Sequence, residues 1–142
     1  MKFSIISLCA LPLAAVAQLT ATTLTVSWDP VYGNAGFDLL TSACSDGKNG
    51  LVHKGYKTAG DLPSFPNIGG AFSIGGWDSP NCGKCYSLEY EGVTIYVTAM
   101  DTGSDGFNLS EQAMNTLTNG RANEAGRIVA NFAEAPQEKC FP

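Results

Sequence analysis

Four cysteines constrain the fold of this chain more than any other feature of its sequence. Cys82 and Cys85 are separated by two residues, whereas Cys44 lies far upstream and Cys140 lies almost at the end. The fifth cysteine, Cys9, belongs to an N-terminal segment that resembles an export signal. Cysteines placed in this way are typical of an oxidised, extracellular protein whose distant segments are cross-linked.

The first residues have the pattern of a secretory signal peptide. Lys2 supplies a positive charge, residues 5–16 are apolar, and residues 15–17 form a small-x-small cleavage site. The apolar run is too short to span a bilayer. We therefore expect a signal peptide of residues 1–17, a single mature domain of residues 18–142, and a secreted protein.

The chain is acidic, with thirteen Asp and Glu residues against eight Lys and Arg residues and a formal net charge of −5 at pH 7. The basic residues are scattered and form no patch. Because nucleic acids and many membrane surfaces are anionic, this charge argues against nucleic acid and membranes as partners. Charged residues are sparse and Gly, Ser, Thr and Asn are plentiful, which is typical of a loop-rich β protein.

The four cysteines allow three disulfide pairings. A redox CxxC site usually opens a helix, which lowers the thiol pKa, but Cys85 leads into the strand-like residues 86–90. A structural zinc site usually needs two pairs of Cys or His ligands, and this chain has one close pair and one histidine. We therefore predict two structural disulfides and no metal. The short spacer favours Cys44–Cys82 with Cys85–Cys140, and the crossed pairing stays open.

Alternation of apolar and polar residues predicts several short strands. The first spans residues 24–28, and the last spans residues 127–133. The clearest hairpin joins residues 86–90 to residues 93–99 across a Glu-Gly turn. Residues 51–56 form another candidate strand. Short strands with long turns between them indicate a small β barrel.

One segment has the pattern of a helix. Residues 109–118 have an apolar face, with Asn108 as the predicted N-cap and Glu111 completing a capping box. Asn-Gly at residues 119–120 is a stop signal. Residues 59–76 are dense in Gly and Pro, and we expect a long ordered loop there rather than a helix.

Seven ordered motifs accompany the four cysteines along the predicted mature chain. They are VSWDPVY at 26–32, CSDGKNGL at 44–51, KGY at 54–56, LPSFP at 62–66, IGG at 68–70, GWDSPNCGKC at 76–85 and AMNTLTNG at 113–120. In these motifs the chain closely resembles the cerato-platanin family of secreted fungal proteins.

The resemblance implies a mainly β, single-domain, six-stranded double-psi β barrel with one or two short helices and two disulfides. It supports the Cys44–Cys82 and Cys85–Cys140 pairing. Family members bind chitin-type N-acetylglucosamine oligomers, loosen cellulose without clear hydrolysis, and in many cases elicit plant defence. The resemblance therefore implies a protein outside the cell or in the fungal wall, polysaccharide ligands, a plant receptor as a further partner, and no cofactor.

Asp101 is the first candidate for chemistry. In expansin-like barrels, which the family resembles, an acidic residue at the matching place is the functional acid. Sequence alone also allows an ordinary turn aspartate. Hydrolysis of a glycosidic bond usually needs two carboxylates, so the alternative reading is a weak glycoside hydrolase that uses Asp101 with Asp29 or Asp46. Asp29 before Pro30 is more simply a strand-end turn residue. A third reading is a surface-active, self-assembling coat protein of the wall.

Sugar sites combine aromatic faces with amides, hydroxyls and carboxylates. The sequence-predicted ligand-binding residues are Tyr32, Asp46, Asn49, Asn81, Asp101 and Asn108.

Three further residues have other expected roles. Trp77, beside the cysteine pair, is expected in the core. His53 has no motif around it and receives no catalytic role. Asn108 also begins a glycosylation sequon, but as the predicted helix cap it would be engaged with the backbone.

Overall fold

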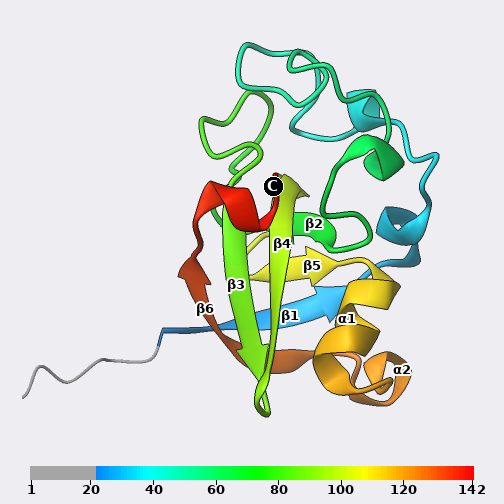
Figure 1. The fold of residues 1–142 in the computed structure, drawn as a ribbon, viewed down its shortest axis with the longest axis vertical. Helices are drawn as coiled ribbons and strands as arrows, with labels where there is room; N and C mark the ends of the chain where they lie inside the picture. Colours follow the sequence, from blue (N-terminus) through cyan, green and yellow to red (C-terminus); the bar gives the residue numbers. More distant parts are fainter. Residues whose placement is uncertain (1–21) are drawn as a thin grey trace, which may run out of the picture.

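The computed structural model describes residues 22–142 (Figure 1). The predicted signal peptide, residues 1–17, lies outside the described residues, so its cleavage remains a prediction. In the part of the chain that the structure describes, no helix is both long enough and apolar enough to cross a membrane.

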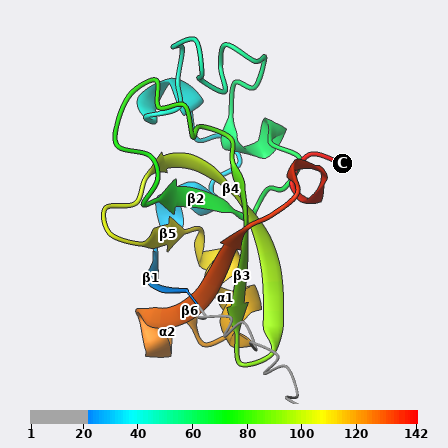
Figure 2. The ribbon, with the colours of Figure 1, turned by 90° about the vertical axis from the view of Figure 1, so that its left-hand side faces the viewer.

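Six strands form a closed barrel in the order β1-β5-β2-β4-β3-β6, and β6 pairs back onto β1 (Figures 1 and 2). β1 runs parallel to β5 and β2 runs parallel to β4, while the other four pairs are antiparallel. This is the mainly β, six-stranded barrel that the resemblance implies. The strands are β1 (Thr23–Trp28), β2 (Ile68–Ala71), β3 (Cys85–Tyr90), β4 (Val93–Thr102), β5 (Phe107–Leu109) and β6 (Ile128–Glu134).

The strands with clear alternation agree with the sequence-based prediction. β3 and β4 form the expected hairpin, and both turn residues, Glu91 and Gly92, have positive φ angles of 46° and 82°, as a type I′ turn requires. β4 is longer than predicted and continues through Asp101 and Thr102, because β2 pairs with this extension. Asp101 therefore lies within a strand and not in a turn after it.

Two short strands, β2 and β5, were not predicted. β2 lies in the segment 59–76, for which the sequence predicts a loop, and it pairs with β4 on one side and β5 on the other. A side chain at Gly69 would collide with the carbonyl oxygen of Asn108, and one at Gly70 would collide with that of Thr102. Glycine therefore serves close packing between backbones here, a use that a turn-based reading misses.

The main helix, α1 (Glu111–Thr118), begins two residues later than predicted. Its N-cap is Ser110, whose hydroxyl oxygen accepts a hydrogen bond from the backbone N–H of Ala113 at 3.0 Å. The predicted cap, Asn108, is wrong, because Asn108 and Leu109 belong to β5. Asn119 ends the helix as predicted, in the left-handed conformation with φ 54°.

The rest of the chain forms short helical turns and loops. α2 (Ala122–Ala125) follows α1 closely. Residues 51–55 form consecutive turns and Tyr56 belongs to no regular element, so the candidate strand at residues 51–56 is wrong. Short 3₁₀ helices cover Pro30–Gly33, Leu39–Thr41, Ala59–Asp61 and Gln137–Lys139.

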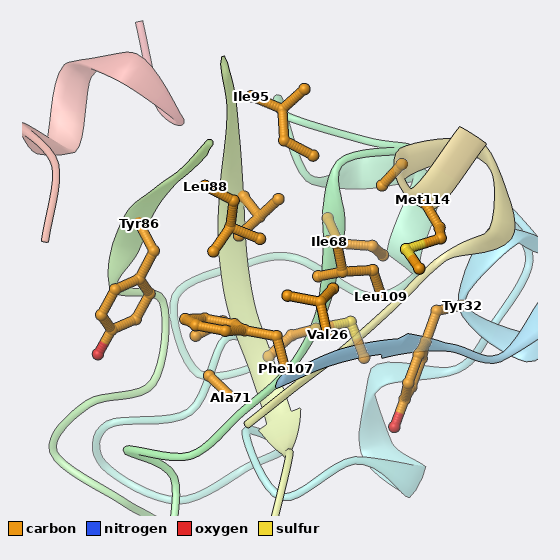
Figure 3. Close-up of a cluster of buried hydrophobic side chains, with 14 of the residues drawn as sticks. Val26, Tyr32, Ile68, Ala71, Tyr86, Leu88, Ile95, Phe107, Leu109 and Met114 are labelled. Carbon is orange, nitrogen blue, oxygen red and sulfur yellow. The ribbon is translucent and has the colours of Figure 1, made fainter. Parts of the chain in front are cut away.

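Apolar side chains from every strand and from α1 form the core (Figure 3). Phe107 of β5 contacts Tyr86 and Phe132 in edge-to-face geometry, with ring centroids 5.3 and 5.8 Å apart. Full burial of a side chain such as Phe107 contributes about 1.5–3 kcal/mol. Tyr32 lies at the margin of the side chains in Figure 3, on the opposite side from Tyr86.

Two disulfides cross-link the fold, in the favoured pairing. Cys44–Cys82 joins the loop after β1 to the loop after β2, and Cys85–Cys140 joins the start of β3 to the C-terminal segment. The Cα atoms of the pairs are 5.4 and 5.7 Å apart, within the usual range. The long connections between β1 and β3 lie together above one end of the barrel, away from α2 (Figures 1 and 2).

The disulfides generate the first prediction. The double variants Cys44→Ala/Cys82→Ala and Cys85→Ala/Cys140→Ala should each lose roughly 4 kcal/mol of unfolding free energy in guanidinium titrations. Their sequence separations, 38 and 55 residues, imply nearly equal loop-closure entropies.

Brief proteolysis serves as the internal control, because the variants should be cut in different places. The first variant should be cut between residues 40 and 84, and the second near the C-terminus. A loss below about 1 kcal/mol in both variants would contradict the stabilising role of the disulfides.

Candidate functional site

Asp101 and Tyr32, which the sequence analysis put forward together, are in direct contact. The Tyr32 hydroxyl donates a hydrogen bond to Asp101 Oδ2 at 3.0 Å. The other carboxylate oxygen, Oδ1, accepts hydrogen bonds from the backbone N–H groups of Ala43 and Thr102 at 3.0 and 2.9 Å. Asp101 therefore ties the end of β4 to the loop after β1 and to the 3₁₀ turn that contains Tyr32.

Tyr32 is only 7% exposed and packs edge-to-face against Phe37, with ring centroids 5.7 Å apart. Its position is set by the turn Pro30–Gly33, where Asp29 Oδ1 accepts a hydrogen bond from the N–H of Val31 at 2.9 Å. Asp29 is thus the strand-end turn residue expected from the sequence. Burial raises the pKa of the Tyr32 phenol far above its usual value, and the negative charge of Asp101 raises it further.

A polar groove of about 510 Å³ begins directly after Asp101. Its walls come from β1, from the end of β4, from the connection between β4 and β5, from β5, and from the residue that precedes β6. They carry hydroxyls, one amide, one carboxylate and one guanidinium. The lining residues are Thr25, Ser27, Thr102, Gly103, Ser104, Asp105, Gly106, Asn108 and Arg127.

Asn108 is the sequence-predicted binding residue that lines this groove. Its Oδ1 accepts a hydrogen bond from the Ser27 hydroxyl at 3.1 Å, and within residues 22–142 its Nδ2 group has no hydrogen-bond partner. The amide is therefore oriented by β1 and keeps two N–H donors for a ligand. Asn108 is not a helix cap, so its side chain is not engaged with the helix backbone as the sequence analysis expected.

Asp46 and Asn49 lie in the loop after Cys44, which packs on the loop that contains Trp77 and Asp78. Asn49 donates from its backbone N–H to Asp78 Oδ1 at 2.7 Å and from Nδ2 to the Asp78 carbonyl at 3.0 Å. The Trp77 indole N–H donates to Asp46 Oδ1 at 3.1 Å, and this hydrogen bond lowers the pKa of the exposed Asp46 carboxyl. Trp77 is 65% exposed, so its expected place in the core is wrong.

Asn81 lies in the same loop as Trp77, and its side chain has a structural role. Its Nδ2 donates to the carbonyl of Ser73 at 2.8 Å, and the Ser73 hydroxyl contacts the Tyr86 hydroxyl at 2.6 Å. His53 is exposed and makes no hydrogen bond within the described residues. The same residues contain no group of three or more His, Cys, Asp or Glu side chains able to hold a metal ion.

The structure therefore brings Tyr32 into contact with Asp101 and places Asn108 in the groove. Asp46 and Asn49 do not bond to each other; each is hydrogen-bonded to the loop that contains Trp77 and Asp78. Sequence reasoning missed most of the groove wall. The polar face of β1, where Thr25 and Ser27 alternate with core residues, was a usable signal. The contribution of Arg127 depends on the pairing of β1 with β6, which no local pattern shows.

A sequence profile of the cerato-platanin family matches residues 24–141, almost the whole described chain. The chain belongs to the cerato-platanin family. It is 44% identical over 144 aligned residues to a heat-stable 19 kDa antigen of Coccidioides immitis, an alignment that covers 99% of this chain and 98% of the antigen.

Solved structures of cerato-platanins agree in fold. Cerato-platanin 1 from M. perniciosa superimposes with a TM-score of 0.80 and 44% identity, covering 82% of this chain and 98% of that one. The solution structure of the fungal elicitor cerato-platanin gives a TM-score of 0.75 and 37% identity, covering 83% of this chain and 97% of that one. The barrel described above is thus the cerato-platanin fold.

The Tyr32–Asp101 contact generates the second prediction. Tyr32→Phe should lower the unfolding free energy by about 1.5–3 kcal/mol at neutral pH, because it removes a hydrogen bond to a charged group. The raised pKa adds a pH dependence. Unfolded tyrosine ionises near pH 10 while folded Tyr32 keeps its proton, so the Tyr32 contribution is complete below about pH 10 and is lost as the pH rises further.

Denaturant titrations between pH 7 and 11 test the expected pH dependence of the contribution of Tyr32 to stability. The difference in unfolding free energy between the wild type and Tyr32→Phe should shrink above pH 10. Tyr96→Phe, whose hydroxyl has no hydrogen bond within residues 22–142, is the matched control. A constant difference across this range would contradict the prediction.

Proposed function

We propose that this protein is a secreted fungal protein that binds cell-wall polysaccharide without hydrolysing it. Its ligands are oligomers of N-acetylglucosamine or chains of cellulose. The observation that carries the proposal is the polar groove beside Asn108, whose volume lies in the range of small-ligand sites and whose hydroxyl, amide and charged groups can hydrogen-bond sugar hydroxyls. Membership of the cerato-platanin family supports the same conclusion.

The groove suits a neutral, hydroxyl-rich ligand. Asn108 supplies two amide donors, Ser27 and Thr25 supply hydroxyls, and Asp105 and Arg127 place opposite charges in the same groove. Sugar hydroxyls both donate and accept hydrogen bonds, so such a mixed lining can satisfy them. The acidic chain would repel strongly anionic ligands.

Non-hydrolytic action is supported by the surroundings of Asp101. A hydrolase needs one carboxyl group that donates a proton to the leaving oxygen. Both oxygens of Asp101 accept hydrogen bonds from protein donors. The two candidate partners are also engaged, since Asp29 caps a turn and Asp46 accepts the Trp77 N–H. We infer that Asp101 is the functional acidic residue of a loosening activity, acting at the end of β4 where the groove begins.

Recognition by a plant is the second part of the proposal. A relative of known structure is described as a fungal elicitor. We infer that this protein is perceived in the same way, with a plant receptor as partner. The self-assembling coat has less support, because the exposed large apolar side chains of residues 22–142 are distributed over four segments of the chain. They are Val31, Leu40, Phe72, Trp77 and Val129.

Binding in the groove generates the third prediction. Asn108→Ala should weaken the binding of chitohexaose or cellohexaose about tenfold in calorimetric titrations, because a positioned amide with two donors is lost. Asn123→Ala, an exposed asparagine of α2 outside the groove, is the matched control and should leave the affinity unchanged. Equal affinities of the wild type and Asn108→Ala would exclude the groove as the site.

Loosening without hydrolysis generates the fourth prediction. The wild type should disperse filter paper, and the concentration of reducing sugar ends should not rise steadily with time. Asp101→Asn should lose dispersion and keep its fold, because the amide oxygen can still accept from Ala43 and Thr102, and the Tyr32 hydroxyl can turn to accept from the new amide. Steady release of reducing ends by the wild type, lost in Asp101→Asn, would establish a hydrolase instead.

A further inference from the structure

Trp77 is held in an unusual position for a tryptophan. It is 65% exposed, yet its only polar atom is satisfied, because the indole N–H donates to Asp46 Oδ1 at 3.1 Å. The other tryptophan, Trp28, packs against the core and donates its N–H to the carbonyl of Ala122 at 2.8 Å. Burial in the core therefore explains the position of the Trp28 side chain. It does not explain that of Trp77, whose indole ring is oriented by a hydrogen bond and is exposed to solvent.

The loops that carry Trp77 and Asp46 are fastened to each other. Asn49 makes two hydrogen bonds to Asp78, the residue after Trp77. Asp78 has a positive φ of 60°, a left-handed conformation that is uncommon outside glycine but that aspartate tolerates. The Cys44–Cys82 disulfide closes the same pair of loops. Little conformational freedom remains to be lost when a ligand binds, which favours affinity.

Asp46, which orients the indole ring of Trp77, also has a carboxylate oxygen that can accept a hydrogen bond from a ligand. Asp46 Oδ1 accepts from Trp77 and, at 3.4 Å, from the Ser45 hydroxyl. No other residue among those described donates to Oδ2. The lowered pKa keeps this carboxyl ionised at neutral pH. An open indole face next to a charged acceptor matches a sugar ring, which offers C–H groups from one face and hydroxyls from its edge.

The pair is connected to Asp101 through the backbone. The N–H of Asp78 donates to the carbonyl of Ala43 at 3.3 Å, and the N–H of Ala43 donates to Asp101 Oδ1 at 3.0 Å. Trp77 is therefore linked by backbone hydrogen bonds to Asp101, the residue that precedes Thr102 of the groove wall.

We propose that Trp77 is a stacking platform for a pyranose ring of a neutral, β-linked polysaccharide, with Asp46 as its brace and as acceptor for a sugar hydroxyl. This second binding position rests on the proposed function and extends it beyond the groove. A second copy of the chain fits less well, because both copies carry a net negative charge and Asp46 adds a carboxylate at the contact. The same carboxylate disfavours acidic sugars.

Calorimetric titration with chitohexaose and cellohexaose tests the proposal. Trp77→Ala should weaken the affinity about tenfold, and Trp77→Phe, which keeps a ring but loses the N–H, about threefold. Asp46→Ala should weaken it about threefold or more. Leu40→Ala, which removes another exposed apolar side chain, is the control and should change nothing. Maltohexaose, whose α-links expose no flat face, and oligogalacturonate should bind more than tenfold more weakly than cellohexaose.

The outcomes separate this proposal from the function on which it rests. If the wild type binds neither hexasaccharide, both fail. If Asn108→Ala weakens binding but Trp77→Ala stays within twofold of the wild type, the groove stands and the platform is refuted. If Trp77→Ala abolishes self-association in sedimentation experiments and leaves sugar affinity unchanged, Trp77 is a contact between copies and the platform is again refuted.

Discussion

The barrel depends on close backbone packing around one four-residue strand. β2 joins β4 to β5, and without it the sheet would remain open between them. This contact requires glycine at positions 69 and 70, where any side chain would collide with a neighbouring carbonyl oxygen. The pairing with β2 also extends β4 to Asp101 and Thr102 and so determines where the groove begins. The close backbone contacts at Gly69 and Gly70 thus determine the positions of Asp101 and of the groove residues that follow it.

The long loops depend on that end of the barrel in turn. Asp101 accepts the N–H of Ala43, and Cys44 donates its own N–H to the carbonyl of Met100. The Cys44–Cys82 disulfide then fixes the loop after β2 to the loop after β1. The two disulfides hold these loops and the C-terminal segment against the barrel, and loop-closure entropy accounts for their expected contribution to stability.

Local features of this fold can be predicted from the sequence, whereas features made by distant segments cannot. Features marked by local periodicity or by turn chemistry were predicted correctly, such as the hairpin, its Glu-Gly turn and the end of α1 at Asn119. Features that depend on distant partners were not. The sequence of residues 68–71 predicts a loop, but these residues form a strand because they pair with β4 and β5. Leu109 was predicted as the first residue of the helix, but it belongs to β5 and its side chain is buried in the core. Asp101 was proposed through the family resemblance and Tyr32 from the chemistry of sugar sites, whereas the contact between them, the groove wall and the exposure of Trp77 depend on the folded barrel.

The unequal environments of the two tryptophans give the protein two distinguishable optical probes. Trp28 packs against the core and points its N–H at a backbone carbonyl, while Trp77 faces water. Emission from Trp28 should therefore report the integrity of the barrel, and emission from Trp77 the state of the loop surface, including its accessibility to a soluble quencher. The natural sequence thus allows loop motion and global unfolding to be followed separately without an added label.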